Sequence, residues 1–425
     1  MLNRKINSFQ EKRPMQYIKT KHKVFSGILL GFLLFGLKEF AELIYHPLQS
    51  AIALIGLLFV FGSSFFFRYK KINPLKGNIK FIFYVYLLWI FFIIIRPALS
   101  GESYSDNSIH PYSSYGLSSY LLPLVVLLGI NVISLQKLFK MIFLFSIIGF
   151  VFFVFNFNMM QAVVFRGETM TIDGEIGLGE LANLYYFWFS ISSLSLLCYE
   201  FVSTKYKWAA IFTNLFSLFL MAYFARRSGI FIFILYFFGM FYLYLDQSKS
   251  RYRIMKILFI FVILSIVYLI VENNSNSIFS ILFDRLKQDT RSDVDETLIK
   301  YLTRENAWWF GKGIEGAYKH PGFDAPRYVH ETGFLYLILK GGIIYLSLYV
   351  VLLLHAAYLG FFKTKNRFTQ ALALYIFFHI IFLIPFGLPS FSLEYLFVWI
   401  GFALCESSYY RTLSNMQFKN YLAKN

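Results

Sequence analysis

The sequence predicts an all-α polytopic membrane protein with about twelve transmembrane helices and one long outer loop that contains short amphipathic helices. Of its 425 residues, 58% are hydrophobic and only 15% are charged, whereas a soluble domain carries roughly 25% charged residues. The apolar runs are long, which favours helices of roughly 20 residues over the strands of roughly 10 residues in an outer-membrane barrel. Basic loops alternate with loops that mostly lack Lys and Arg, as the positive-inside rule predicts for repeated crossings.

The order of these elements follows from the apolar runs and the basic loops between them. We expect a cytoplasmic tail (1–23), nine spans (24–272), the outer loop (273–332), three spans (333–405) and a second cytoplasmic tail (406–425). The first tail has no short apolar region that ends in a cleavage site, so no cleaved signal peptide is expected. The approximate spans are 24–45, 48–67, 79–95, 119–133, 138–157, 181–202, one ending near 224, 230–245, one ending near 271, 334–359, 368–388 and 393–405.

The net charge of +17 reflects Lys and Arg in short inner loops, so no nucleic-acid partner is expected. Cys198 and Cys405 lie in apolar segments without a CxxC motif or a neighbouring histidine. We expect buried thiols, and neither a disulfide nor a zinc site. No paired-aspartate motif occurs in a loop suited to a metal-bound sugar nucleotide, so the sequence predicts neither a metal nor a cofactor.

Two arginines break the charge pattern, because Arg226 and Arg227 occupy a tight turn on the predicted outer face. They precede Ser228 and Gly229 at the start of a span. Guanidinium groups beside the free N–H groups of a helix N-terminus suit phosphate oxygens. The alternative is that both side chains extend to lipid headgroups.

The outer loop has a second candidate phosphate site. Ser292 and Asp295 have the spacing of an N-cap and its capping-box partner, and apolar residues at helical spacing predict an amphipathic helix that ends at Gly311. Arg291 stands beside the N-terminus of this helix, where an anion is favoured. Three carboxylates of its first turn are interpreted as complementing the helix dipole: Asp293, Asp295 and Glu296.

His330 immediately precedes a predicted span, with Glu331 beside it. It would lie at the membrane–water boundary, where a neutral imidazole can take a proton from an attacking hydroxyl. The alternative is a structural histidine held by hydrogen bonds. His355 and His379 lie within apolar spans, where we expect a packing role.

Three segments resemble the O-antigen ligase/O-antigen polymerase superfamily, which comprises bacterial inner-membrane glycosyltransferases with a GT-C-type helical fold. They are ARRSGIFIFIL, RSDVDETLIKYLTRENAWWFGKGIEGAY and HETGFLYLILKGGI, and together they cover under a fifth of the chain. The chain departs from the family pattern at Glu331, where Asn is common, and at Lys340, where an acidic or neutral residue is usual.

The resemblance implies a multi-pass inner-membrane enzyme that transfers glycans at the periplasmic face by metal-independent inversion, without a cofactor. The implied donor is an undecaprenyl-pyrophosphate-linked glycan, and the acceptor is another glycan or the lipid A core. Membrane lipids surround the enzyme, and the family allows a chain-length regulator protein as a partner. The implied catalytic residues are His330, Arg291 and Arg227, and the implied substrate-binding residues are Arg226, Arg166, Arg304 and Glu331.

Two questions stay open at this point. Arg166 lies in a Gly-containing outer loop that resembles one in polymerases, which favours polymerisation of O-antigen, capsule or exopolysaccharide units over ligation. A lipid-linked oligosaccharide flippase is the alternative of another class, and it would place functional charges within the membrane. Candidates for such charges are Lys38, Glu39, Glu42, Lys340 and Glu394. The outer arginines and the long polar loop have no role in a flippase, so an enzyme is favoured.

Overall fold

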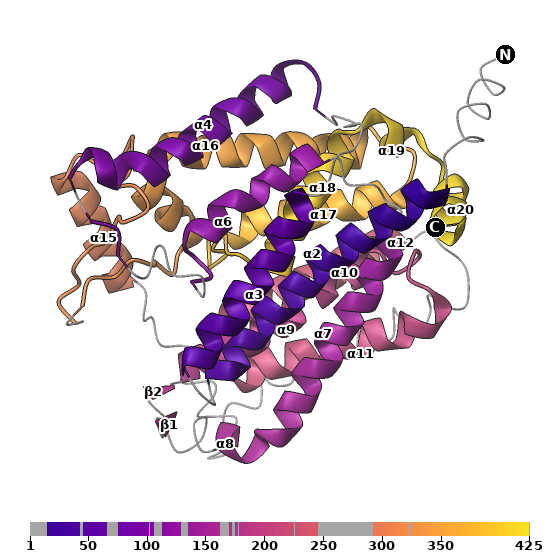
Figure 1. The fold of residues 1–425 in the computed structure, drawn as a ribbon, viewed down its shortest axis with the longest axis horizontal. Helices are drawn as coiled ribbons and strands as arrows, with labels where there is room; N and C mark the ends of the chain where they lie inside the picture. The colour runs from indigo at the N-terminus through magenta and orange to yellow at the C-terminus, as the bar shows by residue number, and fades with distance from the viewer. Residues whose placement is uncertain are drawn as a thin grey trace.

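The computed structural model shows a bundle of helices (Figure 1). It describes residues 15–42, 46–65, 75–101, 103–105, 113–128, 135–161, 170–171, 175–176, 178–224, 226–244, 292–322 and 325–424. Strands β1 (Met170–Thr171) and β2 (Glu175–Ile176) pair in antiparallel fashion. The helices, with 3-10 helices marked η, are α2 (Met15–Glu42), α3 (His46–Phe65), α4 (Gly77–Leu99), α6 (Leu117–Leu121), η1 (Leu122–Leu128), α7 (Leu135–Phe155), α8 (Phe157–Gln161), α9 (Leu178–Ser190), α10 (Ser192–Leu197), η4 (Thr204–Tyr206), α11 (Lys207–Tyr223), α12 (Arg227–Tyr244), α15 (Ser292–Arg304), α16 (Gly333–Phe362), α17 (Arg367–Phe382), α18 (Leu393–Glu406), α19 (Ser408–Thr412) and α20 (Asn415–Lys424).

A helix lies at each predicted span that falls within the described residues; the span ending near 271 lies outside them. Two predicted spans differ from single α-helices. The span at 119–133 passes from α6 into η1, where Pro123 cannot donate a helical hydrogen bond. The span at 181–202 is interrupted between α9 and α10, where Ser193 Oγ donates to Ser190 O at 2.6 Å. Such hydroxyl–backbone bonds compete with the helical ladder.

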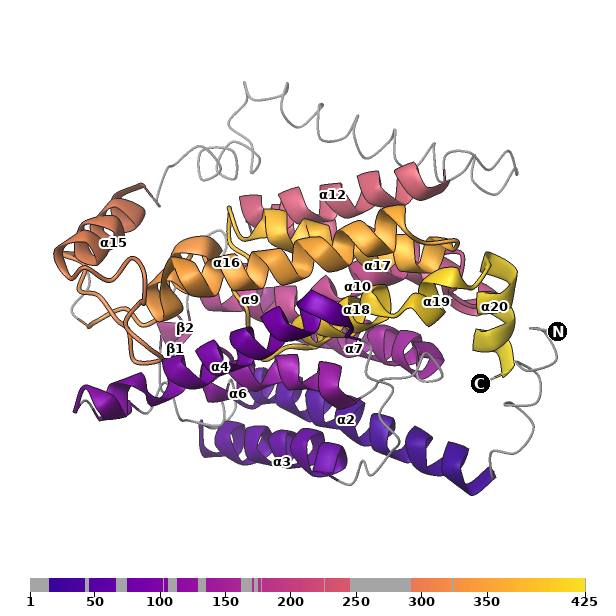
Figure 2. The same ribbon diagram turned by 90° about the horizontal axis from the view of Figure 1, so that it is seen from above.

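Among the described residues, three helices are long and apolar enough to cross a membrane: α4, α12 and α16. One face of α4 exposes large apolar side chains, with Phe81 71% and Leu88 68% exposed, as expected of a surface that contacts lipid. The start of α2 and all of α20 lie at one end of the bundle, and α15 lies at the other (Figures 1 and 2). Cys198 and Cys405 are buried free thiols, as predicted.

α16 is broken at Gly342, whose φ of 74° and ψ of −179° are not helical. A side chain is strained at such a φ, and an added Cβ would lie 2.0 Å from the Trp309 carbonyl oxygen. The break frees carbonyls of the preceding turn for other donors. These bonds are Lys312 N to Leu339 O at 2.7 Å, Gly313 N to Lys340 O at 2.9 Å and Trp89 Nε1 to Gly341 O at 2.8 Å.

α4 presents a matching carbonyl, because Pro97 has no N–H to donate to the Ile93 carbonyl four residues earlier. The Ile314 N–H donates to it instead, at 3.0 Å. Arg96 Nη1 in turn donates to the Phe310 carbonyl at 2.6 Å. Residues 308–316, which we name the docked loop, thus lie between the last turns of α4 and the break in α16.

Candidate functional site

The predicted amphipathic helix is present as α15, but it ends at Arg304 and not at Gly311. Asn306 adopts a left-handed conformation with φ 48°, and the Ala307 N–H donates to the Leu302 carbonyl at 2.9 Å. This is the hydrogen-bond pattern of a helix C-terminal cap, in which Asn replaces the usual Gly. The cap turns the chain from α15 into the docked loop.

Two histidine–aspartate pairs fix α15 to the segment that follows the docked loop. His330 Nε2 lies 2.7 Å from Asp295 Oδ1, and His320 Nε2 lies 3.1 Å from Asp293 Oδ2. Thr332 Oγ1 donates to the Asp295 carboxylate at 2.8 Å. The interpretation of Asp293 and Asp295 as carboxylates that only complement the helix dipole is therefore incomplete, because each also binds a histidine.

His330 is fully buried, and both of its ring nitrogens are engaged. A carboxylate only accepts, so Nε2 donates to Asp295; Nδ1 then accepts from the Tyr318 hydroxyl at 2.8 Å. Burial lowers the pKa of His330 below its ordinary 6.5, although the Asp295 carboxylate opposes this shift. Burial also raises the pKa of Tyr318 to about 12. In this arrangement neither nitrogen of His330 is open to an acceptor hydroxyl.

The lowered pKa of His330 predicts that α15 loosens in acid. The unfolded segment binds the proton more readily than the folded one, so this stabilising contribution is complete above about pH 6.5 and is lost as the pH falls through the lowered pKa. We expect amide hydrogen exchange in α15, corrected for intrinsic rates, to be faster at pH 5.5 than at pH 7.5. His330→Gln should reduce this difference. Equal protection of wild-type α15 at both pH values would contradict the prediction.

A pocket of about 350 Å³ lies beside the docked loop, and we name it the cationic pocket. Lys340 and Arg327 line it, and the described residues that line it include no Asp or Glu. Lys340 is 3% exposed, and its Nζ donates to the Ile314 carbonyl at 2.7 Å and to the Gly316 carbonyl at 2.8 Å. Two neutral carbonyls orient this ammonium, and the buried Glu315 carboxylate acts on it electrostatically. Because both charged residues in the described lining are cations, the pocket favours an anion.

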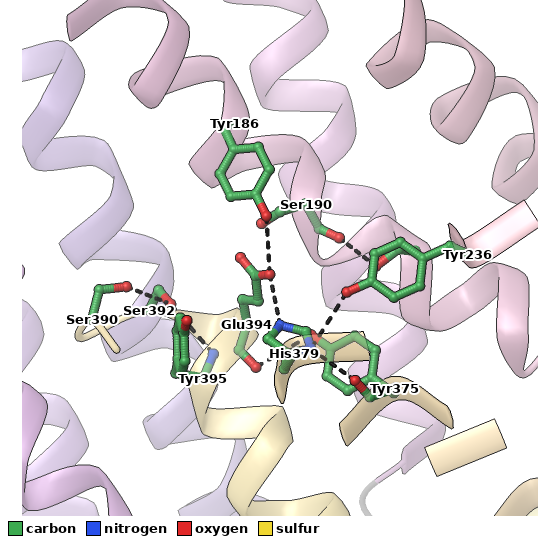
Figure 3. Close-up of polar contacts among 10 residues, drawn as sticks. Tyr186, Ser190, Tyr236, Tyr375, His379, Ser390, Ser392, Glu394 and Tyr395 are labelled. Carbon is green, nitrogen blue, oxygen red and sulfur yellow. Dashed lines mark hydrogen bonds and ion pairs between the residues drawn. The ribbon is translucent and has the colours of Figure 1, made fainter. Parts of the chain in front are cut away.

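A second pocket, of about 280 Å³, is lined by Glu394 and by the buried Lys38, and is named the Glu394 pocket. Figure 3 shows Glu394 with His379 and several tyrosines around it. Tyr115 lines both pockets. It is held by Tyr336, whose hydroxyl donates to the Tyr115 carbonyl at 3.3 Å. The cationic pocket and the Glu394 pocket are therefore neighbours that share one wall.

The predicted arginine turn lies at the same end of the bundle as the Glu394 pocket. α12 runs parallel to α9 and α10, because Phe233 packs against Tyr186 while the Tyr244 hydroxyl donates to the Leu197 carbonyl at 2.9 Å. Arg227 is the first residue of α12 and precedes Phe233 along the helix. It therefore lies toward the end of the bundle that contains the Glu394 pocket. Arg226 is partly exposed and Arg227 is exposed.

The structure does not gather all of the predicted site residues. Arg304 is exposed, forms an ion pair with Glu305 at 3.2 Å and lines neither pocket. Glu331 lies 3.5 Å from Arg327, which does line the cationic pocket. Arg166 and Arg291 lie outside the described residues.

Three buried groups have partners that the sequence does not predict. Lys340 and Glu394 are charges within apolar spans, a signal of function, yet the sequence offers them as functional charges only for a flippase. His379 was expected to pack, yet its Nε2 lies 2.7 Å from Glu394 Oε1. Nothing in the local sequence marks Tyr115 or Arg327, because their importance arises from neighbours far along the chain.

Membership of the O-antigen ligase/O-antigen polymerase superfamily rests only on the three segments that resemble it, and it stays a prediction. No family model, curated protein or solved structure matches the chain.

Proposed function

We propose that this chain is a membrane glycosyltransferase that extends glycans carried on undecaprenyl pyrophosphate at the outer face of the bacterial inner membrane. The observation that carries this proposal is the shared wall between a pocket lined by two cations and a pocket lined by a carboxylate together with one lysine. One suits the pyrophosphate of a donor, and the other suits a group rich in hydroxyls. A transferase needs both sites within reach of one reacting carbon.

The cationic pocket supports departure of a pyrophosphate leaving group. Negative charge grows on the leaving oxygen as its bond to the anomeric carbon breaks, and preorganised cations in a water-poor site stabilise that charge. Lys340 and Arg327 line the pocket and would supply this positive charge, and Arg226 and Arg227 lie at the same end of the bundle. The acceptor oxygen attacks from the opposite face of the sugar, which inverts the anomeric carbon.

The proposal includes about twelve spans with both termini in the cytoplasm. The positions of α2 and α20 support it, because the start of α2 and all of α20 lie at the end of the bundle opposite α15 (Figure 1). The two pockets and the docked loop would then face the periplasm, where the lipid-linked donor presents its glycan.

A transfer assay tests the proposed function. The full-length protein in lipid nanodiscs should convert undecaprenyl-pyrophosphate oligosaccharide into longer lipid-linked chains and release undecaprenyl pyrophosphate. Arg227→Gln and Arg291→Gln should each lower kcat/KM by about 100-fold. Arg411→Gln, at the opposite end of the bundle on α19, is the matched control and should retain activity. Absence of transfer by the wild-type protein would overturn the function, and full activity in both site variants would overturn the assigned roles.

A further inference from the structure

Glu394 is a buried carboxylate at the first turn of α18, in the apolar interior of the bundle. Its Oε1 lies 2.7 Å from His379 Nε2 and accepts from the Tyr186 hydroxyl at 3.2 Å. Figure 3 shows the second carboxylate oxygen pointing away from His379. The same carboxylate lines the Glu394 pocket, so part of it remains available to a ligand.

The hydrogen bonds of His379 define the charge of this pair. His379 Nδ1 lies 2.9 Å from the backbone carbonyl of Tyr375, which can only accept, so Nδ1 carries a proton. One further proton then lies between Nε2 and Glu394, either on the imidazolium or on the carboxyl group. The pair is neutral overall in both states, which makes it tolerable in an apolar interior. In the first state Glu394 is a carboxylate that can accept another proton.

The lining of the Glu394 pocket suits a sugar. Ser390 and Ser392 supply hydroxyls beside the carboxylate, Lys38 supplies an ammonium donor, and the rings of Phe382 and Phe386 supply apolar walls. Sites that recognise a small ligand combine such apolar walls with a few convergent polar groups. The Glu394 carboxylate only accepts hydrogen bonds and the Lys38 ammonium only donates them, so the ligand must bring both donors and acceptors, as sugar hydroxyls do.

We propose that the Glu394 pocket binds the acceptor sugar and that Glu394 removes the proton from its attacking hydroxyl. This inference rests on the proposed function. The proton moves to Glu394 as the acceptor oxygen bonds to the anomeric carbon of the donor. The anomeric carbon–oxygen bond to pyrophosphate breaks, and its electron pair leaves with the pyrophosphate toward the cationic pocket across Tyr115. His379 balances the charge of Glu394 before the transfer.

This mechanism gives Glu394 the proton-accepting role predicted for His330. The two candidates differ in geometry, because both nitrogens of His330 are bonded to groups of the protein, whereas Glu394 borders a pocket. His330 is then a positioning residue, which acts by holding α15 through Asp295.

α18 offers a matched control at its other end. Glu406 is also buried, and its Oε1 lies 2.7 Å from His355 Nδ1. It lines neither pocket. Glu394→Gln and Glu406→Gln therefore make the same chemical change, in the same helix and the same kind of pair, but only the first removes a carboxylate from a pocket.

The experiment measures transfer, donor binding and Tm for both variants of the full-length protein in nanodiscs, with undecaprenyl-pyrophosphate oligosaccharide as donor and acceptor. Glu394→Gln should lower kcat by about 100-fold or more, the range of a lost general base. Its Kd for undecaprenyl pyrophosphate should stay within about twofold, and its Tm should match that of Glu406→Gln. Glu406→Gln should keep wild-type kcat. Normal kcat in Glu394→Gln would overturn the inference.

A second variant keeps the inference testable if Glu394→Gln fails to fold. Glu394→Asp retains the carboxylate, so its kcat should be at least about tenfold higher than the kcat of Glu394→Ala. Equal inactivity of folded Glu394→Asp and Glu394→Ala would overturn the role of the carboxylate. If the proposed function fails, the result is different, because the wild-type protein itself would then transfer no glycan.

Discussion

Lys340→Met is expected to lower glycan transfer by about 100-fold or more and to weaken binding of undecaprenyl pyrophosphate. Methionine keeps a long unbranched side chain but removes the buried charge that lines the cationic pocket. The transfer assay gives the change in kcat/KM, and displacement of a fluorescent polyprenyl pyrophosphate gives the Kd. We expect kcat/KM to fall and Kd to rise together, because the cation stabilises the bound donor and also the departing pyrophosphate.

Lys312→Met is the matched control for this prediction. Lys312 lies in the same docked loop, but its Nζ pairs with exposed Glu305 at 2.9 Å and lines neither pocket. Loss of the Lys340 ammonium also removes the donor to the carbonyls of Ile314 and Gly316, at a cost of about 1–3 kcal/mol for each buried unpaired group. The Tm must therefore be measured beside the activity. Equal activity of the two methionine variants would refute an anion-binding role for Lys340.

Gly342→Ala is expected to destabilise the end of the bundle that carries α15 by more than about 3 kcal/mol, the scale of a severe local clash combined with a strained backbone. The new Cβ would lie 2.0 Å from the Trp309 carbonyl oxygen at a φ of 74°. The docked loop would have to move out of the break in α16, and the bond from Ile343 N–H to the Trp308 carbonyl, now 2.7 Å, would be lost. Denaturant unfolding in detergent measures the change in free energy.

Gly62→Ala in α3 is the control with the opposite expected sign. No atom lies within 4 Å of the Cβ that it would add, and alanine is more favourable than glycine within a helix by about 1 kcal/mol. A Gly342→Ala protein as stable as the Gly62→Ala protein would show that the break in α16 does not require glycine.

The helices were predictable because a membrane demands long apolar segments whose backbone bonds are satisfied internally. The breaks in them were harder to predict. Pro123 and the serines after α9 are visible in the sequence, but their effect on a helix depends on packing. The break at Gly342 depends on a loop that precedes α16 and fills the space beside it.

The candidate site was predicted in part. Boundary position singled out His330, and helical spacing placed Asp295 in a helix of the same loop. The sequence predicts a separate role for each residue, a proton acceptor for His330 and a charge that complements the helix dipole for Asp295. In the folded protein His330 Nε2 lies 2.7 Å from Asp295 Oδ1. Glu394 and Lys340 stood out only as charges in apolar surroundings. Their partners, His379 and the carbonyls of the docked loop, come from other segments, which spacing along one segment does not reveal.

The bond between Ile314 and Ile93 has a consequence for how the protein is made. In hydrocarbon an unsatisfied carbonyl costs several kcal/mol, and Pro97 denies the Ile93 carbonyl its helical donor. A chain emerging from the ribosome supplies that donor only after most of its helices have been synthesised. The last turns of α4 should therefore reach their final structure late in synthesis, when the docked loop and α16 fold. A nascent chain that ends before Lys340 would lack part of the cationic pocket, so binding of lipid-linked substrate would begin only after Lys340 has been synthesised.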